Sequence, residues 1–93
     1  MGETALMFAV LWVHSTLDDF ARIRAGIDAT QWQVVGSAIH EIERRLRDNP
    51  EEEGESRPNG QRISFVAPLG FTFQPVPDEQ VVVVSNVWWF GKR

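Results

Sequence analysis

The stretch TQWQVVGSAIHEIERRLRDNP, residues 30–50, carries the clearest structural pattern in the sequence. Its large apolar side chains recur at spacings of three and four residues, which is typical of one face of an α-helix of about five turns. Glu41 precedes Arg45 by four residues and Glu43 precedes Arg47 likewise, an order that stabilises a helix. Pro50 ends it, because the residue before a proline avoids the α conformation. The apolar stripe, which needs a partner surface, consists of Trp32, Val35, Ile39, Ile42 and Leu46.

The residues before this helix predict a buried strand and a second, shorter helix. Residues 7–13 are apolar, and the following Ser15-Thr16-Leu17-Asp18 resembles a capping box, so the strand ends and a helix begins there. Gly26 is expected to end this helix. Thr30, with Gln33 three residues on, is expected to begin the long one. The two helices together predict a helical hairpin.

From residue 61 the apolar period changes to two, which indicates strands. Residues 61–67 alternate first, and residues 71–74 alternate after a predicted turn at 68–70. Pro75 and Pro77 cannot donate ladder hydrogen bonds, so this middle strand is expected to fray early or to lie at an edge. Four consecutive valines, 81–84, predict a central last strand. Residues 51–60 are polar and are expected to form a loop.

This order of elements predicts a single α+β domain over residues 1–93. The predicted sheet has four strands and is mainly antiparallel, since the last three strands are joined by links too short for crossovers. The first strand comes before the helical hairpin, which covers one face of the sheet, and the three-stranded meander follows (βααβββ). The prediction leaves the opposite face of the sheet open.

Composition excludes several classes of function. The chain has 93 residues, no cysteine and no tyrosine, so disulfides, cysteine-based zinc sites and thiol nucleophiles are ruled out. His14 and His40 have no metal-ligand spacing, and we expect neither a metal nor another cofactor. The longest apolar run, nine residues at 5–13, is too short to span a membrane and lacks signal-peptide features, so a cytoplasmic protein is expected.

Charge is unevenly placed along the chain. The net charge is −4, which argues against a generally basic nucleic-acid-binding protein. Residues 1–56 hold eleven acids and five arginines, a balance of −6, whereas residues 57–93 hold two acids and four cations, a balance of +2. An anionic target or RNA is therefore expected to meet four residues of the second half: Arg57, Arg62, Lys92 and Arg93.

Two interpretations of these cations remain open. If the uncovered sheet face is free, all four could gather there, and arginine suits phosphate because its planar group donates two parallel hydrogen bonds. Arg62 and Arg57 are then the candidate catalytic residues, with Arg62 on the same face of its strand as Ser64. Alternatively, both arginines pair with the acidic loop, and Lys92-Arg93 are a frayed end.

Aromatic residues near the C-terminus suggest a partner groove. Trp88 and Phe90 are predicted on one face of the last strand and Trp89 on the other, since adjacent strand residues point to opposite faces. Exposed rings mark a partner site, and rings that complete a small core are the alternative. The candidate groove residues are Phe71, Phe73, Trp88, Trp89 and Phe90.

Several stretches resemble the RelE/ParE superfamily of toxins from bacterial type II toxin–antitoxin modules. Residues 42–52, IERRLRDNPEE, are similar to the end of the family's second helix, where an acid, a leucine and Asn-Pro recur. Gly54 to Arg57 resembles a loop of one branch of the family. Residues 65–70, FVAPLG, and the valine-rich last strand up to Val87-Trp88 resemble the meander that follows.

The resemblance implies a small toxin that a cognate antitoxin neutralises, with roles in plasmid stabilisation and growth inhibition. Family members that cleave ribosome-bound mRNA use a cluster of cations on the open sheet face, and members that act on DNA gyrase lack it. Here Phe71-Thr72-Phe73 stands where the nucleases usually show an arginine. A metal-free ribonuclease also needs groups that move protons, and arginine is effectively never deprotonated.

The leading hypothesis is therefore a RelE/ParE-like toxin that acts by binding a macromolecular target, with a helix or strand of its antitoxin laid in an apolar groove. The alternatives are a ribosome-dependent mRNA endonuclease and a degenerate, non-toxic binding module of the same fold. The ribosome with its mRNA, DNA gyrase and a second copy of the chain are possible partners, and a membrane is not.

Overall fold

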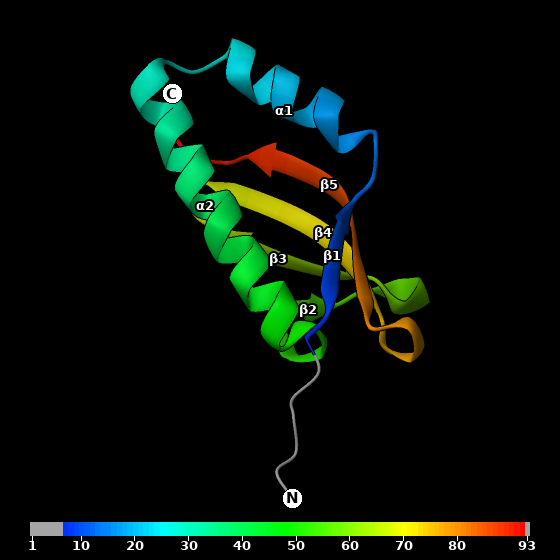
Figure 1. Ribbon diagram of the computed structural model, residues 1–93. Helices are drawn as coiled ribbons and strands as arrows, with labels where there is room; N and C mark the ends of the chain where they lie inside the picture. Colours follow the sequence, from blue (N-terminus) through cyan, green and yellow to red (C-terminus); the bar gives the residue numbers. More distant parts are fainter. Residues whose placement is uncertain (1–6, 93) are drawn as a thin grey trace, which may run out of the picture.

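The computed structural model describes residues 7–92, and in this range the chain forms two helices and one five-stranded sheet (Figure 1). The α+β class and the βααβββ order are as predicted, with one short strand added. The elements are β1 (Ala9–Trp12), α1 (Thr16–Ala25), α2 (Ala29–Asp48), β2 (Glu55–Ser56), β3 (Arg62–Val66), β4 (Leu69–Val76) and β5 (Val81–Trp89), with 3₁₀ turns at Pro50–Glu52, Pro58–Gly60 and Pro77–Glu79.

The sheet is mixed, with the strand order β1-β5-β4-β3-β2. Strand β1 pairs in parallel with β5, and the other neighbours pair antiparallel. The prediction of four strands is wrong, because the segment expected to be a loop contains β2, paired with the start of β3. Two residues are too short to show an alternating pattern. Gly54, at φ +67°, lies so close to the backbone of β3 that no side chain would fit there.

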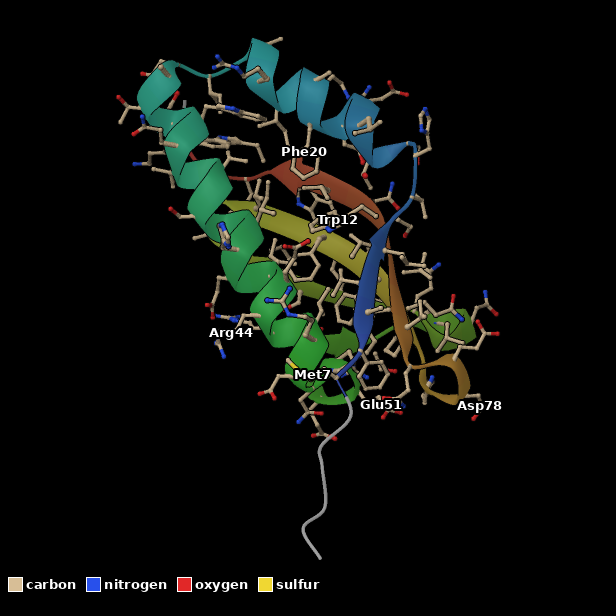
Figure 2. The ribbon with its side chains drawn as sticks, in the orientation of Figure 1. Met7, Trp12, Phe20, Arg44, Glu51 and Asp78 are labelled. Carbon is tan, nitrogen blue, oxygen red and sulfur yellow. The ribbon has the colours of Figure 1, made fainter. Side chains whose placement is uncertain are left out.

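Both helices lie on the same side of the sheet (Figure 1), and the core fills the space between them and β3, β4 and β5. The stripe of α2 faces the sheet as predicted, with Val35, Ile42 and Leu46 fully buried. Trp12 of β1 contacts Phe20 of α1, with ring centroids 5.7 Å apart (Figure 2). The buried core comprises Ile23, Val35, Ala38, Ile42, Leu46, Val66, Leu69, Phe71, Phe73, Val82, Val84 and Val87.

The helix starts differ from the prediction. The long helix is capped by Asp28, whose carboxylate accepts the backbone N–H of Gln31 at 2.8 Å, while the Gln31 amide oxygen accepts the N–H of Asp28 at 2.9 Å. Thr30 therefore lies inside the helix. Ser15 makes no side-chain cap at the first helix, where the Thr16 hydroxyl instead donates to the Val13 carbonyl. Gly26 follows the last residue of α1, as predicted.

Strand β4 is longer and more central than its prolines suggested. It runs through Pro75 and lies between β5 and β3, so the expectation of an edge or early-fraying strand is wrong. The pairing with β3 ends at Phe73, opposite Arg62. Alternation along β4 directs the ring nitrogen of Pro75 toward the β3 side, beyond the reach of β3. The proline therefore removes no ladder hydrogen bond.

Strand β3 turns its polar residue inward. Ser64 and Val66 are buried beneath the helices, whereas the side chain of Phe65 is on the opposite face and the residue is 51% exposed. Ser64 tolerates burial because its hydroxyl donates to the Glu53 carboxylate at 2.6 Å. Phe65 thus faces outward and Ser64 inward, whereas an alternating strand usually turns its apolar residues toward the core.

A β-bulge in β5 decides which residues face the core. Phe73 pairs with Val84 and Thr72 with Asn86, so Ser85 is the extra residue. Because the alternation restarts there, Val82 and Val84 point toward the helices before the bulge, and Val87 does so after it. Without the bulge, Val87 would point to the face opposite that of Val82 and Val84.

The capping box at Asp28 leads to a stability prediction. Asp28→Ala leaves the N–H of Gln31 without its acceptor and is expected to lower the free energy of unfolding by about 1 kcal/mol. Thr30→Ala, the matched control, lies inside the helix and is expected to be neutral or slightly stabilising. Urea unfolding followed by circular dichroism measures both. If Thr30→Ala lowered the free energy of unfolding more than Asp28→Ala does, the assignment of Asp28 as the helix cap would be wrong.

Candidate functional site

The sheet face turned away from the helices, called here the open face, is almost free of charge. The strands contain two charged residues, Glu55 and Arg62, and only Glu55 lies on the open face, at the β2 edge. Directly paired residues share a face, so the register defines the other members. They include Ala9, Leu11, Ile63, Phe65, Gly70, Thr72, Gln74, Val81, Val83, Asn86 and Trp88, with Phe90 just beyond β5.

One side of the open face carries an aromatic cluster, composed of Phe65, Trp88 and Phe90. The Phe65 ring meets Trp88 at 6.1 Å and 84°, and Phe90 at 5.4 Å and 90°, both edge-to-face arrangements that attract. Gly70 makes room for the indole, since a Cβ there would lie 2.5 Å from the Trp88 ring. The three rings are therefore held in place before any partner arrives.

The middle of the open face is polar but neutral. The hydroxyl groups of Thr72 and Ser85 lie 3.1 Å apart, and the Thr72 hydroxyl also lies 3.0 Å from the Asn86 amide oxygen. The bulge brings Ser85 and Asn86 to the same threonine. These two contacts pair both hydroxyl groups and the Asn86 amide oxygen within the face itself.

The structure does not bring the candidate cations together. Arg62 lies on the helix side, where its guanidinium donates to the carbonyls of Glu53 at 2.7 Å and Gly54 at 3.1 Å. Arg57 pairs with Glu55 at 3.2 Å. Lys92 lies at the opposite end of α2, where its carbonyl accepts from Gln31, and 20 helical residues span about 30 Å. Arg93 lies outside the described residues.

Two arginines of α2, Arg44 and Arg45, are engaged by acids. Glu41 accepts from Arg44 at 2.7 Å and from Arg45 at 2.8 Å, and these hydrogen bonds lower the pKa of its carboxyl from 4.5 to about 2. Arg45 also reaches Glu53 at 3.3 Å. Arg44 points away from the sheet (Figure 2). The Glu41–Arg45 pair is thus as predicted, and the second predicted pair is replaced because Glu43 accepts from the indole of Trp12 at 3.0 Å.

A groove lies between α1 and the C-terminal part of β5, called here the α1–β5 groove. It has a volume of about 290 Å³ and is lined by Asp19, Arg22, Ile23, Val87, Trp88 and Trp89. Strand β1 pairs with β5 only as far as Val84. Beyond that point the Asp19 carboxylate accepts the backbone N–H of Val87 at 3.1 Å, a role for which the sequence offers no signal.

This groove contains a free strand edge. The N–H of Phe90 donates to the carbonyl of Pro68 on the β4 side. Since successive strand residues direct their backbone groups to opposite sides, the N–H of Trp89 points into the groove. Among residues 7–92 it has no hydrogen-bond acceptor. An exposed N–H on a strand edge is a template for another extended chain.

The predicted groove residues separate into three environments. Trp88 and Trp89 line the α1–β5 groove, and Phe90 belongs to the aromatic cluster on the open face. Phe71 and Phe73 have no exposed surface and belong to the core, so the prediction that they contact a partner is wrong. Alternation alone could not decide which face of β4 the helices cover.

Both histidines are exposed, and within the described range no three His, Cys, Asp or Glu side chains are grouped in a way that could hold a metal. No helix in residues 7–92 has the length and apolar character needed to cross a membrane.

No family model matches the chain, and no curated protein matches its sequence. The fold is similar to that of a chain in the crystal structure of the toxin–antitoxin complex RelBE2 from Mycobacterium tuberculosis, with a TM-score of 0.67. The similarity covers 95% of this chain and 97% of that one, at 11% sequence identity. The chain therefore has the fold of a subunit of that toxin–antitoxin complex.

The Glu41 ion pairs lead to a pH prediction. Because the pKa of Glu41 is lower in the folded chain than in an unfolded one, its contribution to stability is present above about pH 4.5 and is lost as the pH falls toward 2. The difference in Tm between the wild type and Glu41→Gln should therefore shrink over that range. Calorimetry measures it, with Glu52→Gln as the control for a lost charge. A difference that stays constant would contradict the assignment.

Proposed function

We propose that the chain is a RelE/ParE-type toxin subunit of a toxin–antitoxin module, neutralised by a cognate antitoxin. The observation that carries the proposal is the similarity of fold to a subunit of the RelBE2 complex over nearly the whole of both chains. The resemblance of residues 42–52 and 54–57 to the family supports it independently of the coordinates.

The toxin is proposed to act by binding its target, DNA gyrase or another macromolecule, and not by cleaving RNA. A phosphodiester-cleaving site needs charge stabilisation and proton transfer at one place. Here Arg57 and Arg62 are held by Glu55 and by backbone carbonyls, and Lys92 lies at the other end of α2. The open face, which has no cation on its strands, offers phosphate no counter-charge.

The antitoxin is proposed to occupy the α1–β5 groove as an extended segment. The free N–H of Trp89 offers a backbone hydrogen bond, and Ile23 with the two tryptophans offers apolar contact. Asp19 and Arg22 pair with each other at 2.8 Å, so the groove has little net charge. An incoming strand would continue the sheet where β1 ends.

Growth arrest tests the toxin and separates its alternatives. Induced expression of the chain in a bacterium is expected to stop growth while cellular mRNA stays intact by primer extension. The double variant Arg57→Ala/Arg62→Ala is expected to arrest growth equally, provided circular dichroism shows that it folds. Arrest with mRNA cleavage that this variant abolishes would establish the endonuclease instead. Growth without any arrest would leave the non-toxic binding module.

Amide hydrogen exchange tests the antitoxin site. The protein encoded by the neighbouring gene, bound to this chain, is expected to slow exchange of the Trp89 amide by at least about tenfold, because a strand-edge hydrogen bond forms there. Arg22→Glu should weaken the complex about tenfold by placing a second negative charge beside Asp19. Arg47→Glu, on the exposed side of α2, is the matched control. A tight complex with unchanged Trp89 exchange would place the antitoxin elsewhere.

A further inference from the structure

We propose that the open face docks a second copy of this chain, so that two sheets pack face to face in a symmetric dimer. The proposal does not depend on the toxin function, because it rests only on the chemistry and dimensions of this surface.

The exposed apolar surface is concentrated there. Six large hydrophobic residues of the described chain are markedly exposed, and three of them, Leu11, Phe65 and Phe90, belong to the open face. Further apolar surface comes from four half-buried residues of the same face: Ile63, Val81, Val83 and Trp88. These residues form two apolar patches, one on each side of the polar centre, and exposed apolar patches mark an interaction site more often than free surface.

Charge favours a second copy as the occupant. A two-fold contact sets a surface patch against an identical patch, so a patch with a net charge would meet the same net charge. The chain carries −4 overall, and most of its surfaces would therefore repel a copy. The open face avoids this penalty, because its one strand carboxylate, Glu55, is at the edge and is neutralised by Arg57.

The dimensions of the face also favour another sheet. Five strands about 4.8 Å apart make a surface roughly 24 Å wide, whereas a single partner helix, about 10 Å across, covers only two of them. Two such faces would bury on the order of 1,000 Å², the lower limit for a specific interface. We therefore expect a weak dimer.

The surface is prepared for burial. The aromatic cluster is packed in advance, so docking immobilises few free side chains. The Thr72 hydroxyl already hydrogen-bonds to Ser85 and to the Asn86 amide oxygen, so these three oxygen atoms lose little when water leaves them. Both features lower the cost of contact between two identical faces.

Sedimentation equilibrium of the purified chain alone tests the dimer. We expect concentration-dependent dimerisation that becomes stronger when NaCl rises from about 50 to 500 mM, because salt screens the repulsion between two chains of charge −4. Phe65 and Leu11 lie on opposite sides of the open face. The variants Phe65→Glu and Leu11→Glu are each expected to raise the Kd about tenfold or more by adding a charge to the interface. Circular dichroism verifies that both variants fold.

Leu17→Glu on α1 and Val34→Glu on α2 are the matched controls, since both residues are as exposed as Phe65 but lie on the helices. They should leave the Kd unchanged. A monomer up to about 1 mM, or a dimer that the face variants and controls weaken equally, would overturn the proposal. So would a chain that stays monomeric alone but loses its antitoxin on Phe65→Glu. Growth arrest is measured separately, so failure of the dimer would leave the toxin function standing.

Discussion

The whole structure depends on the contact between one side of α2 and the inner face of β4 and β5. Ile42 and Leu46 have no exposed surface, and neither do Phe71 and Phe73 beneath them. Each element is amphipathic, so neither could bury its apolar side without the other. Because the helices cover one face, most residues on the opposite face of the sheet remain at the surface. The functional character of the protein follows from that division.

A second constraint joins the C-terminal end of α2 to β3 through Glu53. Glu53 accepts from Ser64 and pairs with Arg45, while its backbone carbonyl accepts from Arg62. This carboxylate therefore links helix, connecting segment and strand, and it explains why a serine can be buried in β3. The same contacts engage two arginines that would otherwise be available to phosphate. Among residues 7–92, the contacts that stabilise this end of the fold are thus the same ones that keep Arg45 and Arg62 out of a cationic cluster.

The two surfaces proposed to bind partners are physically different. The α1–β5 groove offers the free backbone N–H of Trp89 at a strand edge, together with apolar contact, which suits an extended segment of another protein. The open face offers apolar and neutral polar side chains across five strands, which suit another flat, uncharged surface. The surfaces meet at Trp88, which lines the groove and belongs to the aromatic cluster.

The sequence by itself determined the elements whose signals are local. The stripe of α2 needs only its own spacing, and Pro50 ends the helix by local sterics. The placement of Trp88 and Trp89 on opposite faces follows from the geometry of any strand. Because such patterns are local, the order of helices and strands was predictable. The coverage of one sheet face followed from the apolar stripe of α2, which needs a partner surface.

Only the tertiary structure decided which side of each strand became core. Phe65 lies outside and Ser64 inside because Glu53, eleven residues before Ser64, supplies a buried acceptor. Ser85 forms a bulge that reverses the alternation of β5, and Gly54 allows β2 to pair where the sequence shows only polar residues. The dispersal of Arg62 and Lys92 to opposite ends of α2 is likewise a property of the folded chain. Pairing partners distant in sequence set these outcomes, and no local pattern encodes them.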